Sequence, residues 1–204
     1  NFALRGLRAV GLDLRTEMLV FADELAQRDH VNVEWLSADM RHLTLSEPVD
    51  IALNVFDGID CLLTNDDLIA HLNTIAENLT DRGLYFIDVT NPCLTSFTYY
   101  EPFHYHGERD GIQVDIRWKG HHTNIDLATH VATTEVEMCI TGNGQDTSFI
   151  DVAQERILTA QEIILLAQST GKLKPVGWFG DYDLKQPFEH SPKSVRMITV
   201  LQKI

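Results

Sequence analysis

The sequence contains few cysteines, few basic residues and no long apolar segment, and each of these shortages excludes a class of protein. The three cysteines, Cys61, Cys93 and Cys139, lie far apart and form no Cys-x-x-Cys pair, which argues against a disulfide framework and a thiolate zinc site. No apolar run approaches the ~20 residues that a membrane-spanning helix needs, and residues 1–11 lack the apolar core of a secretory signal. We therefore expect a protein of the reducing cytoplasm.

Basic residues are outnumbered by acidic ones. The 204 residues include 16 Lys plus Arg against 30 Asp plus Glu, so the formal net charge is −14 at pH 7. A strongly acidic surface repels phosphate backbones and anionic lipid headgroups. Neither nucleic acid nor a membrane is therefore expected as a partner, whereas a hydrophobic content of 44% is typical of a chain that buries a core.

The first ninety residues alternate apolar runs with segments of helical spacing. The runs that predict strands are 7–14, 31–36, 50–56 and 83–89, with a turn at 81–83, and the segments that predict helices are 17–27 and 66–79. Thr16 stands at the expected N-cap of the first helix. Strands and helices that alternate at these lengths indicate a parallel sheet with right-handed crossovers.

After Pro92 the pattern changes to a period of two residues, which is typical of antiparallel strands. It predicts strands at 112–118, 129–141 and 149–158, and then Thr159 and Glu162 match a capping box before a helix that ends near Gly171. Two further strands are expected at 175–179 and 195–202. The fold class predicted is α/β, a Rossmann-like, doubly wound, mostly parallel sheet with an antiparallel β insertion. Its expected parts are a core at 1–94, the insertion at 95–158 and a return to the core at 159–204.

Polar residues follow three of the predicted parallel strands at their carboxyl ends, where open parallel sheets bind ligands. Asp13 ends one strand, Asp39 and Met40 follow the next, and Asn54 to Phe56 end the third. A carboxylate in such a place can accept hydrogen bonds from both hydroxyls of a ribose. Each acid alone could equally be a helix cap or a solvated loop residue, but their joint placement favours a ligand site.

In this order, residues 9–19, 37–41, 50–56 and 79–88 resemble successive motifs of the class I S-adenosylmethionine-dependent methyltransferases. The resemblance covers residues 2–90 and resumes over 159–202. It implies that the cofactor is S-adenosyl-L-methionine. It also implies a role for each strand end: Asp13, with Leu14, binds the ribose, Asp39 and Met40 contact the adenine, and Asn54, Val55 and Phe56 line the methionine part.

One motif of that family does not match. The family's first strand and its Gly-x-Gly-x-Gly loop should precede the ribose-binding acid by about 20 residues, but only residues 1–12 precede Asp13, and Gly6 and Gly11 do not form such a loop. The missing strand is central in the family's sheet, so its absence should leave its neighbours unpaired. We therefore expect the sequence to be part of a longer protein, and expect the chain alone to bind the cofactor poorly.

The insertion carries the candidate groups for catalysis. His104, His106 and Tyr100 are candidates for a general base or a substrate contact. His104 and His106 would share one face of a strand, but no acid or cysteine stands beside them at ligand spacing, so no metal site is predicted. The resemblance implies that this insertion is a substrate-facing lid or an oligomer contact. Its exposed edge strands could pair across two subunits as a homodimer, and the sequence leaves monomer and dimer both open. The segment 178–183 is also similar to one in small-molecule members of the family.

The favoured function is methyl transfer from S-adenosylmethionine to an oxygen, nitrogen or carbon nucleophile of a small molecule. A nicotinamide-dependent oxidoreductase is the first alternative, since it shares the parallel sheet and the ribose-binding acid, but the sequence lacks a Tyr-x-x-x-Lys pair: Tyr99 and Tyr100 are followed four residues on by Phe103 and His104. A non-catalytic scaffold with the same fold is the second alternative.

Overall fold

The computed structural model describes residues 2–92, 103–118, 124–142, 144–189 and 194–204. A short helix, η1 (Ala3–Arg5), precedes strand β1 (Val10–Asp13), helix α1 (Thr16–Arg28) and strand β2 (Glu34–Ser37). Strand β3 (Val49–Asn54) follows, then η2 (Gly58–Cys61), α2 (Asn65–Asn78) and β4 (Leu79–Thr90). After the strands of the insertion come α3 (Ala160–Thr170), β10 (Leu173–Phe179) and β11 (Arg196–Lys203). The α/β class with an antiparallel insertion is confirmed.

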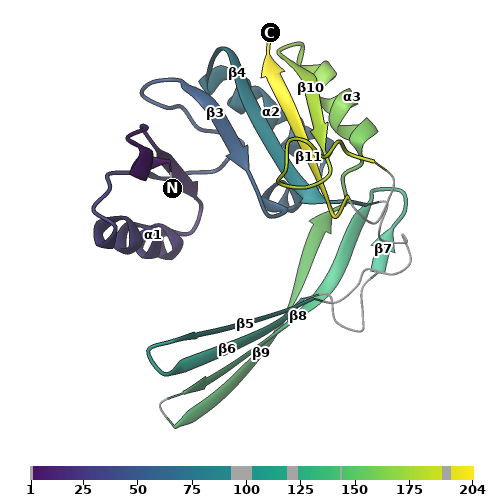
Figure 1. Cartoon of the computed structure of the whole chain (residues 1–204). Helices are drawn as coiled ribbons and strands as arrows, with labels where there is room; N and C mark the ends of the chain where they lie inside the picture. The colour runs from purple at the N-terminus through teal and green to yellow at the C-terminus, as the bar shows by residue number, and fades with distance from the viewer. Residues whose placement is uncertain (1, 93–102, 119–123, 143, 190–193) are drawn as a thin grey trace.

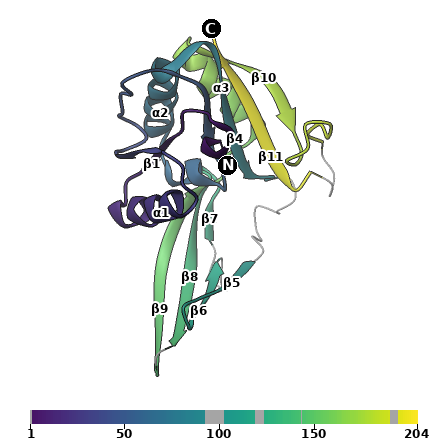
Figure 2. The ribbon, with the colours of Figure 1, turned by 60° about the vertical axis from the view of Figure 1, so that its left-hand side comes forward.

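The main core lies between a four-stranded sheet and two helices. The strand order is β10-β11-β4-β3, in which β3 and β4 are parallel and β11 is antiparallel to both of its neighbours. Helices α2 and α3 pack against this sheet and against each other (Figures 1 and 2). Their apolar residues recur at helical spacing, so that each helix buries one stripe. The largest fully buried side chains include Leu68, Leu72, Tyr85, Ile87, Ile163, Leu173, Met197 and Leu201.

Strands β1 and β2 form a separate, two-stranded parallel sheet, covered by α1 (Figure 1). Within the described residues β1 pairs only with β2, and β3 pairs only with β4. The edges of β1 and β3 therefore lack a shared neighbour, as the absence of a central strand predicts. Ile51 and Leu53 of β3 are correspondingly exposed.

Trp35 fixes the packing of the small sheet. Its ring lies on β1 at Gly11, where an added Cβ would come within 2.0 Å of the ring, and its indole N–H donates to Asp23 of α1 at 3.0 Å. The space that glycine leaves is therefore filled by an aromatic ring.

Two local predictions in this half of the molecule were wrong. The N-cap of α1 is Arg15, and Thr16 is the first helical residue. The Arg15 side chain makes no capping hydrogen bond. Residues 81–83 are not a turn between elements but an irregular part of β4, where Arg82 has φ +63° and the pairing with β3 shifts register. The irregularity does not end the strand, because β4 pairs with both β3 and β11 from Leu84 onward.

The insertion projects from the core as an antiparallel arm (Figures 1 and 2). It consists of β5 (Phe103–Arg109), β6 (Ile112–Trp118), β7 (Asn124–Asp126), β8 (Val131–Gly142) and β9 (Gln145–Arg156), with β5 and β9 as its outer strands. The register places one apolar row across four strands, namely Tyr105, Ile116, Met138 and Phe149. The next row, on the opposite face, is polar and consists of His106, Asp115, Cys139 and Ser148. The arm therefore has one apolar face and one polar face.

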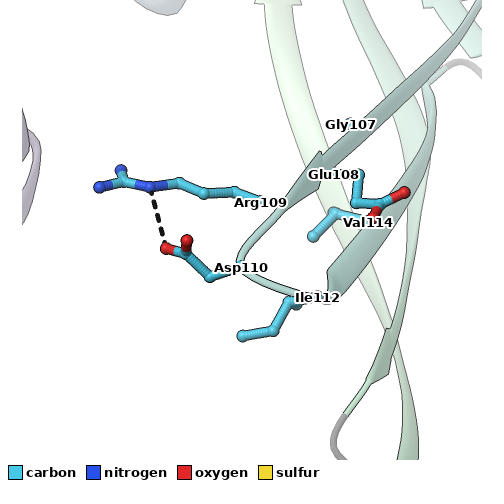
Figure 3. Close-up of a pocket in the computed structure, with 6 residues that line it drawn as sticks. All are labelled: Gly107, Glu108, Arg109, Asp110, Ile112 and Val114. Atoms are coloured by element: carbon cyan, nitrogen blue, oxygen red, sulfur yellow. Dashed lines mark ion pairs between the residues drawn. The ribbon is translucent and has the colours of Figure 1, made fainter.

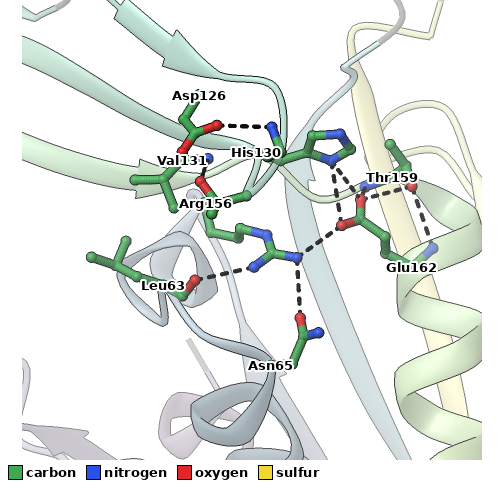
Figure 4. Close-up of polar contacts among 10 residues, drawn as sticks. Leu63, Asn65, Asp126, His130, Val131, Arg156, Thr159 and Glu162 are labelled. Carbon is green, nitrogen blue, oxygen red and sulfur yellow. Dashed lines mark hydrogen bonds and ion pairs between the residues drawn. The ribbon is translucent and has the colours of Figure 1, made fainter.

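The arm is anchored to the core through Arg156 at the end of β9 (Figure 4). Its guanidinium donates to the Leu63 carbonyl at 3.1 Å, to Asn65 at 3.1 Å and to Glu162 at 3.0 Å. Glu162 also accepts from the backbone and hydroxyl of Thr159, which completes the predicted capping box of α3. One buried cation thus joins the arm to the start of α2 and the start of α3.

No helix in the described parts of the chain combines the length and the apolar character needed to cross a membrane.

Candidate active site

The predicted site residues lie at the carboxyl ends of β1, β2 and β3. These strands belong to the two parallel pairs β1/β2 and β3/β4. Asp13 is the last residue of β1, and its Oδ1 accepts from the Arg15 amide at 2.8 Å. Its carbonyl accepts from the Ala38 amide at 3.2 Å, which brings the loop after β2 beside the end of β1. Leu14 is exposed next to Asp13.

Asp39 is held by Arg41. The Arg41 backbone amide donates to Asp39 Oδ1 at 2.9 Å, and its guanidinium donates to both carboxylate oxygens. These hydrogen bonds from Arg41 lower the pKa of Asp39 from its ordinary value to about 2. The same guanidinium reaches Asp67 of α2, so Asp39 is ionised at neutral pH and the loop that carries it is tied to a helix.

A polar stripe on α2 holds the whole loop from residue 39 to residue 45. Beyond Asp67, three side chains at helical spacing bond to the loop backbone. His71 bonds to the Met40 carbonyl at 2.9 Å, the Thr74 hydroxyl donates to the Arg41 carbonyl at 2.6 Å, and the Asn78 amide bonds to the backbone of residues 43 and 45. The stripe therefore fixes the backbone of the loop that carries Asp39 and Met40 relative to α2.

His71 and Tyr85 form the buried part of this support. The Met40 carbonyl can only accept, so His71 Nδ1 carries the proton. His71 Nε2 then accepts from the Tyr85 hydroxyl at 2.6 Å. Burial lowers the pKa of His71 and raises that of Tyr85. Both groups are therefore neutral at physiological pH, and each hydrogen bond has one defined donor.

The end of β3 completes the edge. The Asn54 amide nitrogen lies 3.7 Å from the Met40 sulfur, which links the predicted methionine side of the site to the adenine side. Among the described residues, the buried Oδ1 of Asn54 has no hydrogen-bond partner. Val55 and Phe56 follow with exposed side chains. An unpartnered amide oxygen beside the loop that carries Asp39 fits a ligand with hydroxyl or amino donors.

A second buried network lies directly behind residues 54–57. Arg196 of β11 donates to Asp88 at 2.7 Å and to Asp57 at 3.0 Å, and the Tyr182 hydroxyl donates to Asp88 at 2.7 Å. Sequence reasoning placed Asp57 at the end of the third predicted strand and Tyr182 in the segment 178–183, but it gave no role to Asp88 or Arg196. Nothing near Arg196 in the sequence indicates its partners.

A surface pocket of about 390 Å³ lies at the tip of the arm, between β5 and β6 (Figure 3). Ile112 and Val114 line it from the apolar face. The side chain of Arg109 extends toward α1, where its guanidinium carbon lies 5.0 Å from the centre of the Phe21 ring. The apolar face of the arm therefore turns toward the helix that follows Asp13.

The predicted catalytic histidines lie on the opposite, polar face of the arm. His104 Nε2 lies 2.9 Å and His106 Nδ1 lies 3.1 Å from the same oxygen of Asp115. Hydrogen bonding to His106 and His104 lowers the pKa of Asp115. Within the described residues no hydrogen bond or ion pair joins either histidine to Asp13, Asp39 or Asn54. Tyr100 lies outside the described residues, so the catalytic assignments stay predictions.

Asp115 was missed from the sequence because it reaches the histidines through strand pairing rather than through spacing. In the part of the chain that the structure describes, no group of three or more His, Cys, Asp or Glu side chains is arranged to hold a metal ion.

Comparison with known proteins supports one of the functional alternatives. Residues 1–83 match the family model described as methyltransferase domain. This match over part of the chain and the fold are consistent with a class I S-adenosylmethionine-dependent methyltransferase. No curated protein sequence matches the chain.

Solved structures agree with this assignment at the level of the fold. A S-adenosylmethionine-dependent methyltransferase from Clostridium acetobutylicum superposes with a TM-score of 0.77 at 15% identity, covering 96% of this chain and 75% of that one. The CcbJ methyltransferase from Streptomyces caelestis gives 0.73 at 17% identity, with coverage of 99% and 82%. A structure of an amino pentose methyltransferase from Micromonospora echinaspora with bound S-adenosylmethionine gives 0.67 at 16% identity, with coverage of 97% and 74%.

Proposed function

We propose that this methyltransferase transfers the methyl group of S-adenosylmethionine to a small-molecule acceptor. The observation that carries the proposal is the placement of Asp13, Asp39 and Asn54. Two carboxylates and a buried amide oxygen, unpartnered among the described residues, stand at the carboxyl ends of successive strands. These oxygens accept hydrogen bonds, which suits the hydroxyls of a ribose, an adenine amino group and an ammonium group.

The cofactor supplies an electrophilic methyl group on a sulfonium, so the chain's own residues mainly bind, orient and exclude water. Asp13 accepts from the ribose hydroxyls with the carboxylate oxygen that Arg15 leaves free. Asp39 and Met40 hold the adenine, and Asn54, Val55 and Phe56 border the methionine part. The α2 stripe fixes the adenine loop before the ligand arrives, which reduces the entropy that binding must overcome.

On the acceptor side, we assign His104 and His106 as candidates to take a proton from the nucleophile or to contact the acceptor. Asp115 accepts a hydrogen bond from each ring, so it can orient an imidazole and stabilise its protonated form. A base is required only for an acceptor that is protonated at neutral pH. The acceptor atom is accordingly left open between oxygen, nitrogen and carbon.

The net charge and one structural neighbour support a small molecule as the methyl acceptor. A net charge of −14 disfavours nucleic acid, and one structural neighbour is an amino pentose methyltransferase. Cys61 and Cys139 are free thiols, which fits the proposed cytoplasmic location.

We also propose that two copies of the chain pair through the arm. Its apolar row leaves Tyr105 and Phe149 exposed by about half, and the outer strands β5 and β9 each have one neighbour within the described residues. A second copy brings an identical apolar face, whereas any other acidic surface of this chain would be repelled.

The test is the thermal unfolding of the protein with S-adenosylhomocysteine and, separately, with NAD. A ligand at about 100 times its dissociation constant stabilises the folded state by about 2.7 kcal/mol, so we expect the melting temperature to rise with S-adenosylhomocysteine alone. Asp13→Ala should abolish the rise. Asp29→Ala, which removes an exposed acid at the other end of α1, should keep it.

A rise with NAD alone would favour the nicotinamide-dependent oxidoreductase. A folded protein that responds to neither ligand would favour the non-catalytic scaffold.

A further inference from the structure

Two adjacent residues at the end of β3 have an unusual backbone. Phe56 has φ +55° and Asp57 has φ +59°. The left-handed region is unfavourable for residues other than glycine, and such strain persists only where the surroundings enforce it. Because both residues directly follow Asn54 and Val55, the strain lies in the segment that borders the proposed methionine part of the cofactor.

Asp88 at the end of β4 enforces this conformation. Its Oδ2 accepts from the Phe56 amide at 3.0 Å and its carbonyl accepts from the Asp57 amide at 3.1 Å. Asp57 in turn accepts from the amide and the hydroxyl of Thr90. Both strained residues are therefore bonded to β4 through their own amides, and Asp57 through its side chain as well.

Arg196 compensates the buried charge. Asp88 is 1% exposed, and an unpaired carboxylate there would be strongly destabilising. The Arg196 guanidinium donates to the side chain and the carbonyl of Asp88 and to Asp57. The cation from β11 therefore forms ion pairs with both acids that hold the segment.

Tyr182 extends the network to a different part of the chain. Its hydroxyl donates to Asp88 Oδ2, the oxygen that also accepts from the Phe56 amide. Tyr182 belongs to the segment 180–188, which folds back on itself through backbone bonds from Gly180 to Gln186 and from Phe188 to Trp178. Tyr182 is 60% exposed, yet its hydroxyl reaches the buried Asp88.

We propose that Asp88, Arg196 and Tyr182 are positioning residues that hold residues 54–57 in the shape required by the cofactor and couple the segment 180–188 to cofactor binding. The proposal rests on the proposed function, because it assigns residues 54–57 to the methionine side of the site. Cofactor bound at the methionine side of the site restrains Phe56. Through the Asp88 carboxylate, this restraint reaches Tyr182 and orders the segment 180–188.

The test compares S-adenosylhomocysteine binding by calorimetry in the wild type and in Tyr182→Phe, with Thr80→Val as the matched control. Thr80 donates a hydroxyl hydrogen bond to Asp50 at 2.9 Å at the opposite end of β4, so both variants remove one hydroxyl-to-carboxylate bond. We expect the dissociation constant to rise about threefold to tenfold in Tyr182→Phe and to stay within twofold of the wild type in Thr80→Val.

Hydrogen exchange supplies a readout that a purely structural role would not change. In the wild type, S-adenosylhomocysteine should slow amide exchange in peptides that cover 180–188, and this protection should be lost in Tyr182→Phe. Asp88→Asn should accelerate exchange of the Phe56 and Asp57 amides in the free protein. If Asp88→Asn does not fold, Tyr182→Phe alone carries the test.

Equal affinity and equal protection in Tyr182→Phe and the wild type would overturn the coupling while leaving the methyltransferase intact. A wild type that binds no S-adenosylhomocysteine would instead overturn the proposed function, and the coupling with it.

Discussion

At the scale of single residues, Gly11 shows how one missing side chain shapes the site. The Trp35 ring occupies the space where a Cβ would lie, and Gly11 is two residues before Asp13. We predict that Gly11→Ala displaces the ring, weakens its bond to Asp23 and lowers the free energy of unfolding by about 1–3 kcal/mol, as overpacking typically does. Urea unfolding measures this.

Gly107→Ala is the control, because a Cβ at Gly107 on β5 meets nothing within 4 Å. A loss of stability in Gly107→Ala as large as that in Gly11→Ala would mean that contact with Trp35 is not the cause.

His71 gives a prediction about pH. Its pKa in the folded protein is lowered from 6.5 by burial, so folding favours the neutral ring. The stability that this contributes is complete above pH 6.5 and is lost as pH falls from 6.5 toward the folded pKa, by up to about 1.4 kcal/mol per pH unit. We expect urea unfolding at pH 7.5 and pH 5.5 to show a larger loss in the wild type than in His71→Gln.

Glutamine keeps a polar side chain at position 71 but does not titrate. Parallel losses in the two proteins would assign the acid sensitivity to other groups.

At the scale of secondary-structure elements, Glu162 joins the start of α3 to the root of the arm. It completes the capping box with Thr159 and pairs with the largely buried Arg156. Burial raises the pKa of Glu162, but hydrogen bonds from Thr159 and Arg156 outweigh this and lower it overall. We predict that Glu162→Gln, which removes the charge and keeps the size, lowers the free energy of unfolding by about 1–3 kcal/mol.

Glu77→Gln is the matched control, since Glu77 pairs with Lys172 at 2.8 Å on the surface and exposed pairs contribute about 0–1 kcal/mol. The destabilisation caused by Glu162→Gln should also shrink as pH falls below 4.5. The lowered pKa of Glu162 in the folded wild type contributes progressively less stability there, because the carboxyl of the unfolded chain is already protonated. Chemical unfolding of both variants at pH 7 and pH 4 checks both statements.

At the scale of the whole molecule, the two faces of the arm predict how copies associate. Phe149 and Ile150 are adjacent in β9, both exposed, and on opposite faces of the arm. We predict that Phe149→Asp raises the dissociation constant of the dimer at least about tenfold by placing a charge on the apolar face. Ile150→Asp on the polar face should leave it unchanged.

Sedimentation velocity over a concentration series measures both variants. A monomeric wild type, or equal effects of the two substitutions, would contradict pairing through the apolar face.

Much of this architecture was predictable because it is encoded locally. Hydrophobic periodicity located the strands and helices, Thr159 and Glu162 marked the start of α3, and the acids at strand ends marked the edge where we propose that the cofactor binds. The supports behind that edge were not predictable in the same way. His71 bonds to Met40 across 31 residues and Arg196 to Asp88 across 108, and such pairs are set by packing rather than by spacing.

The division of the core into two sheets has a consequence for how the molecule opens. Asp13 and Asp39 belong to the small sheet and its loop, whereas Asn54 belongs to the large sheet. A cofactor bound as we propose would therefore bridge two structural units. Local opening of the small unit, which lacks strand pairing to the large sheet within the described residues, would release the ligand without unfolding the main core. The bound cofactor would then hold the two sheets together, and part of its binding free energy would raise the free energy needed to separate them.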